Sequence, residues 1–200
     1  MFHSTKFSIL PPVVKNLLII NLLVFLATIV LRDSRIIDLN HILAWHGAGS
    51  AYPFQIWQPI TYMFMHGDFY HIFFNMFGIW MFGTQLENVW GSKRFLNFYL
   101  LTGLGAGCIH FLLFDGSLIG ASGAFYGLLF GFGIMFPNAI LMLIFPPIPI
   151  KAKYFVIIMG IIEMYRGLTS TGNIAHFAHL GGALFAFLII KYWQSQINKR

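Results

Sequence analysis

Long apolar runs recur along the chain, and short segments between them hold most of the polar residues. A helix that crosses a bilayer needs about 20 mostly apolar residues. Six stretches meet this requirement, so we expect spans at about residues 13–31, 68–86, 95–114, 119–136, 152–168 and 174–193. The pattern predicts an all-α, polytopic membrane protein, a bundle of six transmembrane helices forming one integral membrane domain over residues 1–200.

Two apolar segments need separate treatment. The first run lies near the N-terminus like a signal peptide, but no small-residue cleavage site follows it, so we expect a retained first span. The segment "PNAILMLIFPPIPIKAK" (137–153) holds four prolines, which disfavour a regular spanning helix. We predict a structured surface loop there. Few residues flank the first and last spans, so no appended soluble domain is expected.

Composition supports the membrane interpretation. Hydrophobic residues make up 58% of the chain and charged residues 9%, whereas soluble domains carry roughly 25% charged residues. The net charge of +6 comes from residues in short loops, so it indicates orientation in a bilayer and no nucleic-acid partner. The one cysteine, Cys108, excludes an intrachain disulfide and is expected to be a small buried side chain.

The basic residues are distributed unevenly between the two sides. Nine of the twelve lie on the same side as the N-terminus, and loops rich in Lys and Arg face the cytoplasm. We therefore expect both termini in the cytoplasm and a long outer loop at about 32–67. The expected location is a bacterial plasma membrane.

The second, fourth and sixth spans run in the same direction, so their N-terminal turns should lie at one depth near the outer face. Polar residues gather in those turns: His71, Asn75, Ser122, Tyr126, His176 and His179. Unpaired polar groups inside a bilayer cost several kcal/mol. These side chains should therefore face each other or a hydrated cavity.

A hydroxyl, imidazoles and a carboxamide at one level are the ingredients of nucleophilic acyl transfer. Structural explanations stay open for each residue alone: a serine that allows helices to pack, a histidine that donates a structural hydrogen bond, an asparagine that links helices. Glycines at 123, 127 and 131 form a smooth stripe, which Gly182 and Ala186 of the last span can face.

Three motifs resemble those of rhomboid intramembrane serine proteases. "GASGAFYG" (120–127) is similar to their GxSG motif, "HIFFN" (71–75) to HxxxN, and "AHLGGALFA" (178–186) to AHxxGxxxG. Their order and spacing also agree, and similarity extends over about residues 50–190. Ala186 replaces the last glycine of the third motif, which leaves a small residue at that position.

The resemblance implies a rhomboid-like bundle and a serine endopeptidase with a Ser–His dyad. Ser122 would be the nucleophile and His179, rather than His176, the general base. The side chains of His71 and Asn75 and the backbone N–H of Ser122 would form the oxyanion hole. The supporting residues would be Tyr126, stacked on His179, and Gly120, Gly123, Gly182 and Ala186.

The implied partners are the lipid bilayer and protein substrates that span it, with no cofactor and no metal. A hydrolytic site needs water, so it should open to the outside. The fifth span and the loop "RGLTSTGN" (166–173) have few anchors, and we expect them to cover or gate the site.

The acidic residues have other expected roles. Asp68 suits a helix cap, Glu163 should pair with Arg166 at i+3, and Glu87 should pair with Lys93 or Arg94. None is expected to orient His179.

Two other functions remain. A non-proteolytic member of the same fold would bind membrane clients without cutting them. A metal-binding channel or transporter would use a histidine-rich cluster: His66, Asp68, His71, His176 and His179.

Overall fold

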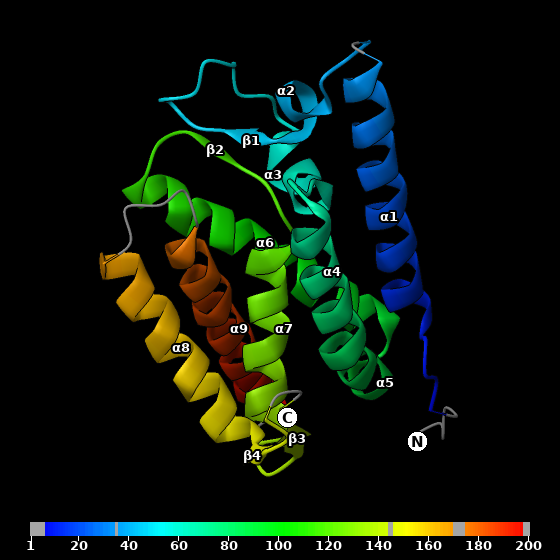
Figure 1. Ribbon diagram of the computed structural model, residues 1–200. Helices are drawn as coiled ribbons and strands as arrows, with labels where there is room; N and C mark the ends of the chain where they lie inside the picture. The colour runs from blue at the N-terminus through cyan, green and yellow to red at the C-terminus, as the bar shows by residue number, and fades with distance from the viewer. Residues whose placement is uncertain (1–6, 35, 144–145, 170–174, 198–200) are drawn as a thin grey trace.

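The computed structural model describes residues 7–34, 36–143, 146–169 and 175–197. The chain is mostly helical in these parts (Figure 1). Its longer helices are α1 (Pro12–Asp33), α4 (Phe69–Gly78), α5 (Thr84–Trp90), α6 (Ser92–Leu113), α7 (Ser122–Met135), α8 (Ala152–Thr169) and α9 (His176–Ile197). The shorter ones are α2 (Leu39–Leu43), α3 (Gln58–Thr61) and the 3-10 turn η1 (Tyr62–Phe64).

The second apolar stretch is one continuous run of three helical pieces. A π-helical turn, η2 (Ile79–Gly83), joins α4 to α5. Asp68 caps the start of α4, as predicted, by accepting a hydrogen bond from the backbone N–H of His71 at 2.9 Å. This cap fixes the entry of the chain into the helix that carries His71 and Asn75.

The fold is not purely helical, because two small antiparallel ribbons occur. Strand β1 (Trp45–His46) pairs with β2 (Ser117–Leu118), and β3 (Ile140–Met142) pairs with β4 (Pro149–Lys151). The second ribbon lies in the proline-rich segment between α7 and α8, where a structured loop was predicted. The first ribbon ties the loop after α1 to the segment that leads into α7.

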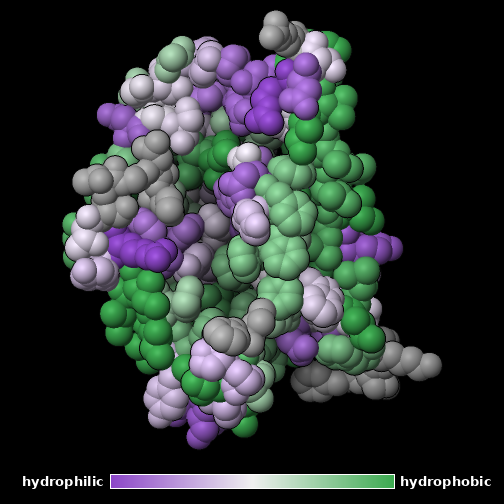
Figure 2. All heavy atoms as spheres, viewed as in Figure 1, coloured by the Kyte–Doolittle hydropathy of each residue, from purple (hydrophilic) through white to green (hydrophobic). Residues whose placement is uncertain are grey.

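Two helices, α1 and α6, are long and apolar enough to cross a membrane by length and composition. The helices α1 and α8 also expose rows of large apolar side chains. These include Ile19, Leu22, Leu23, Leu26 and Val30 on α1, and Ile157, Ile161, Tyr165 and Leu168 on α8. Figure 2 shows hydrophobic residues along both flanks and hydrophilic residues gathered towards the upper end. Such flanks suit lipid, and the number of six spans remains a prediction.

Helix α9 packs against α6, α7 and α8. The helices α4, α7 and α9 all run downward in Figure 1, and each begins at its upper end, below the loop that holds α2 and β1. The alternation of spans predicts this arrangement, which places three N-terminal turns at one end of the bundle.

Close approach of α7 and α9 depends on glycine. A Cβ atom on Gly182 would lie 2.0 Å from the carbonyl oxygen of Gly123, so no other residue fits there without moving a helix. The glycine stripe of α7 therefore meets Gly182 of α9, as expected, and it also packs closely against α6. Cβ atoms on Gly123 and Gly127 would meet Ala106 and Thr102 of that helix.

Two sequence expectations were wrong. Glu87 does not pair with Lys93 or Arg94 in the described part of the chain. Its buried carboxylate accepts hydrogen bonds from the first turn of α1, at 3.0 and 2.8 Å from the backbone nitrogens of Val13 and Val14. This contact satisfies N–H groups that a helix start leaves free. Cys108 is exposed rather than buried, because it lies on the outer face of α6.

Candidate active site

Ser122 is the first residue of α7, directly after a turn that only glycine makes easily. Gly120 has φ of +115° in that turn. A Cβ atom there would also lie 2.6 Å from His71 Nε2. The glycine therefore lets the chain bring Ser122 close to the side chain of His71 without backbone strain.

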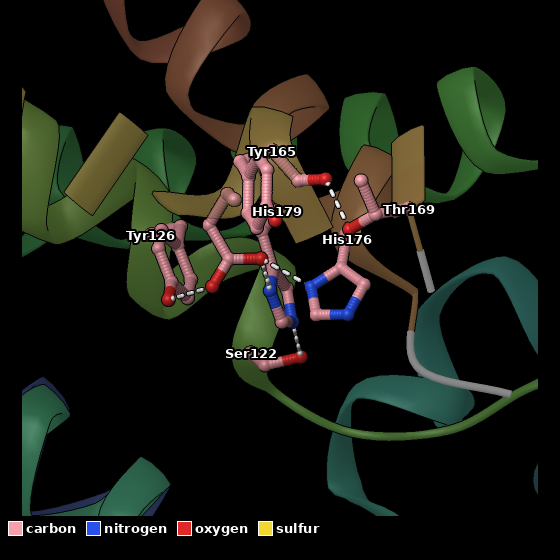
Figure 3. Close-up of polar contacts among 7 residues, drawn as sticks. Ser122, Tyr126, Tyr165, Thr169, His176 and His179 are labelled. Carbon is pink, nitrogen blue, oxygen red and sulfur yellow. Dashed lines mark hydrogen bonds and ion pairs between the residues drawn. The ribbon is translucent and has the colours of Figure 1, made fainter. Parts of the chain in front are cut away.

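The structure brings Ser122 and His179 together. His179 lies in the second turn of α9, and its Nε2 is 2.9 Å from Ser122 Oγ (Figure 3). The ring of Tyr126 stacks on the imidazole, with centroids 4.3 Å apart and planes inclined by 6°. These three side chains come from two helices that touch through Gly182 and Gly123, so the close packing sets the distance between hydroxyl and imidazole.

Glu163 of α8 corrects the expectation that no carboxylate faces His179. Its Oε2 lies 2.9 Å from His179 Nδ1 and 2.7 Å from His176 Nδ1. Its Oε1 accepts a hydrogen bond from the Tyr126 hydroxyl. The ion pair expected with Arg166 does not occur in the described part of the chain. Arg166 is exposed, whereas Glu163 is buried.

His176, the alternative base, takes a different position. It is buried and its Nδ1 contacts the carboxylate of Glu163, and the described residues show no hydrogen bond between His176 and Ser122. The serine contact belongs to the histidine one turn further into α9. The role of His179 as the general base stays a prediction.

A cavity of about 590 Å³ opens beside the serine. Its lining includes Ser122, His179 and Tyr126 on one side and His71, Phe74 and Asn75 of α4 on the other. In Figure 2 the surface is hollowed between the flank that α4 forms and the flank that α8 forms. All the polar residues predicted from the second, fourth and sixth spans therefore surround one cavity, except His176, which lies behind it.

Hydrogen bonds orient the α4 side chains. The backbone N–H of Gly67 points at His71 Nδ1 at 3.4 Å, so this nitrogen is an acceptor and the ring hydrogen sits on Nε2. Asn75 donates one amide hydrogen to the carbonyl of His71 at 2.8 Å. Its second amide hydrogen is left for another acceptor. Both residues can thus present N–H groups towards the cavity.

The histidine-rich cluster expected for a metal does not form as one group. Asp68 caps α4. His66 is buried beside His71, with ring centroids 4.9 Å apart, and burial lowers the pKa of His66 to about 3, so its ring is neutral at pH 7. The ligand atoms that do lie together, within 4.8 Å of one another, belong to Glu163, His176 and His179. The carboxylate of Glu163 already makes a hydrogen bond with each of the two histidines.

Sequence reasoning missed several polar residues near the cavity, among them His110 and Glu163. His110 of α6 lines the cavity and is buried. It belongs to no motif, and α6 corresponds to the third predicted span, whereas the expected site residues come from the second, fourth and sixth. Glu163 was expected to pair with Arg166 on its own helix, whereas it contacts His179 of α9. Nothing in the sequence shows which face of α8 meets α9.

Comparison with known proteins gives a consistent result. The family model of the rhomboid domain matches residues 53–195. A putative rhomboid protease of Bacillus subtilis, YdcA, is 28% identical over 166 residues, which cover 76% of this chain and 79% of that protein. The mitochondrial rhomboid protein 1 of Saccharomyces cerevisiae is 30% identical over 146 residues, covering 68% of this chain.

The chain spans less than half of some relatives. The match covers 42% of the yeast protein and 14% of the rhomboid protease GluP of Bacillus subtilis, which is 36% identical over 73 residues. Some relatives are named proteases and others are named only as rhomboid proteins. The matched region contains all three motifs and the helices that surround the cavity, so the chain belongs to the rhomboid family of integral membrane proteins.

Proposed function

We propose that the protein is an intramembrane serine endopeptidase that cleaves transmembrane segments of other membrane proteins. The observation that carries the proposal is the 2.9 Å contact between Ser122 Oγ and His179 Nε2 at the edge of a cavity. A hydroxyl in contact with an imidazole is the arrangement that activates serine as a nucleophile. Membership of a family with protease-named members supports the same reaction.

The proposed reaction follows from the positions of these groups. Ser122 attacks the scissile carbonyl carbon while His179 Nε2 takes the hydroxyl proton. His179 then protonates the leaving amine, and a water molecule releases the acyl group from the serine. Because the cavity is open, it can supply this water inside an otherwise apolar bundle.

The negative charge that develops on the carbonyl oxygen in the tetrahedral intermediate needs hydrogen-bond donors that already point at it. We propose that His71 Nε2–H, the Asn75 amide and the backbone N–H of Ser122 supply them. Ser122 begins α7, and the first N–H groups of a helix have no partners within it. The Gly67 contact that leaves the hydrogen on His71 Nε2 supports this role.

The proposed substrate is a helix that must first unwind. Carbonyl groups inside a helix are hydrogen-bonded and turned away from a nucleophile. Segments with glycine or proline near the membrane surface unwind at the lowest cost. We therefore expect cleavage near the outer face, at helix-breaking sequences, with the cavity open to the outside.

Helix α8 and the loop 166–173 are proposed as the gate. Residues 170–174 of this loop lie outside the described residues. Helix α8 carries Glu163, which contacts His179, and its outer face is apolar. A crosslink between α8 and α4 that leaves cleavage of a transmembrane substrate at the full rate would contradict this role.

The test uses purified protein in liposomes with a single-span substrate that carries glycine and proline near one end of its span. Wild-type protein should release two fragments, and Ser122→Ala should release none. His179→Ala should lose most of the activity, whereas His176→Ala should lose less. An inactive His176→Ala with an active His179→Ala would show that the base is assigned wrongly.

The same assay separates the alternatives. A client-binding protein would retain the substrate without cutting it, in wild type and Ser122→Ala alike. A metal-dependent protein would lose its function on treatment with a chelator. We expect a chelator to leave the cleavage rate unchanged.

A further inference from the structure

We propose that Glu163 is a positioning residue for His179, so that the proposed peptidase works through a Ser122–His179–Glu163 arrangement rather than a dyad. The inference rests on the proposed function and deepens it. Three contacts carry it, from the carboxylate to His179 Nδ1, His176 Nδ1 and the Tyr126 hydroxyl.

The carboxylate determines where the imidazole hydrogen lies. An ionised carboxylate only accepts hydrogen bonds, so the Nδ1 atom that contacts it at 2.9 Å must carry a hydrogen. A neutral His179 then has its lone pair on Nε2. That atom is the one 2.9 Å from Ser122 Oγ. Glu163 thus selects the tautomer that can take the proton of the serine.

The carboxylate also holds the ring in place from a third helix. Tyr126 of α7 stacks on one face of His179 and donates its hydroxyl hydrogen to Glu163 of α8. His176, one turn before His179 on α9, donates to the same carboxylate oxygen at 2.7 Å. Both carboxylate oxygens therefore have partners, which offsets the cost of burying the charge.

Charge adds a second effect during the reaction. When His179 takes the serine proton it becomes a cation, in surroundings where its side chain is 12% exposed and that of Glu163 6%. Opposite charges attract more strongly there than in water. The carboxylate should therefore stabilise the protonated ring that forms with the tetrahedral intermediate.

The experiment compares Glu163→Gln, which removes the charge but keeps the shape, and Glu163→Leu, which also removes the acceptor. We expect turnover of the single-span substrate to fall about 10²-fold or more in both variants, as for the orienting carboxylate of other serine hydrolases. KM should change little, because Glu163 does not line the cavity that receives substrate.

Val156→Ala is the matched control on α8. Val156 is buried against Gly133 of α7, far along the helix from the site. Its truncation loosens the same helix pair, so it reports what loss of packing alone does to turnover. If Glu163→Gln lowers turnover no more than Val156→Ala does at an equal loss of thermal stability, Glu163 is a packing residue and the inference is wrong.

A spectroscopic measurement tests the tautomer directly and does not depend on proteolysis. Protein with ¹⁵N-labelled histidine should show the hydrogen of neutral His179 on Nδ1 in wild type and in Ser122→Ala. In Glu163→Leu this preference should be lost. A hydrogen on Nε2 in wild type would overturn the inference. Absence of cleavage by wild type would instead contradict the proposed function and leave the tautomer result to be judged separately.

Discussion

Asn75 and Asn21 are buried asparagines that make the same local contact in different places. Each donates an amide hydrogen to the carbonyl four residues earlier, at 2.8 and 2.7 Å, and the side-chain oxygen of each has no partner among the described residues. Asn75 lines the cavity, whereas Asn21 lies in α1 away from it. Comparing variants of these two residues therefore separates a structural role of the side chain from a role in binding the oxyanion.

We predict that Asn75→Ala reduces the rate of substrate cleavage about 10²–10³-fold, the effect of removing one oxyanion donor. Asn21→Ala should keep cleavage within a few-fold of wild type while losing a similar hydrogen bond. Equal losses in the two variants would show that Asn75 matters for folding and not for the reaction.

At the scale of residues, sequence reasoning identified the polar groups around the cavity but not all of their contacts. Ser122 and His179 could be matched because each follows from a motif and from the common direction of two helices. Glu163 could not, because an arginine three residues away is an obvious partner in the sequence. Only the packing of α8 on α9 shows that the carboxylate of Glu163 contacts His176 and His179 instead of Arg166.

Between elements, the contact of α7 with α9 is the tightest in the described structure that bears on the site. A Cβ atom on Gly182 would lie 2.0 Å from a backbone oxygen of Gly123, and backbone cannot move aside as a side-chain tip can. Any side chain at 182 must therefore push the helix of His179 away from the helix of Ser122.

We predict that Gly182→Ala lowers the free energy of unfolding by about 1–3 kcal/mol, the usual cost of overpacking, and lengthens the Ser122–His179 contact, so that cleavage slows. Gly160→Ala on α8 is the control, since its Cβ would meet only the tip of Phe130, at 3.1 Å. Thermal unfolding in detergent compares the stability of the two variants. A Gly182→Ala protein that unfolds at the wild-type temperature would contradict the packing account.

Helix positions were largely predictable and their interruptions were not. The stretches predicted at 13–31, 95–114 and 152–168 correspond to α1, α6 and α8 within about three residues. Apolar length alone determines such boundaries. The π-helical turn at Ile79–Gly83 and the β3–β4 ribbon depend on how neighbouring elements pack, and no residue pattern in the chain indicates them.

For the whole molecule, the two ends of the bundle differ. The cavity lies towards the end where α4, α7 and α9 begin, and α1 begins and α9 ends at the opposite end (Figure 1). The expected excess of basic residues is on the side of the termini. Orientation in a membrane is therefore the property that decides on which side cleavage occurs.

We predict that a cysteine placed at Ala48, in the loop beside the cavity end, reacts with a membrane-impermeant maleimide in intact bacterial cells. A cysteine at Lys93, at the opposite end, should react only after the cells are permeabilised. Both positions are exposed, and the single natural cysteine, Cys108, is first replaced by serine. The reverse pattern would place the termini outside and the cavity facing the cytoplasm.

The central claim is that Ser122 is a nucleophile activated by His179, and covalent labelling tests it most directly. Purified wild-type protein is treated with a fluorophosphonate, and the modified peptide is identified by mass spectrometry. We expect one adduct on Ser122, no labelling of Ser122→Ala, and labelling slowed at least about 10²-fold in His179→Ala. An unmodified Ser122, or labelling at the same rate without His179, would contradict the account.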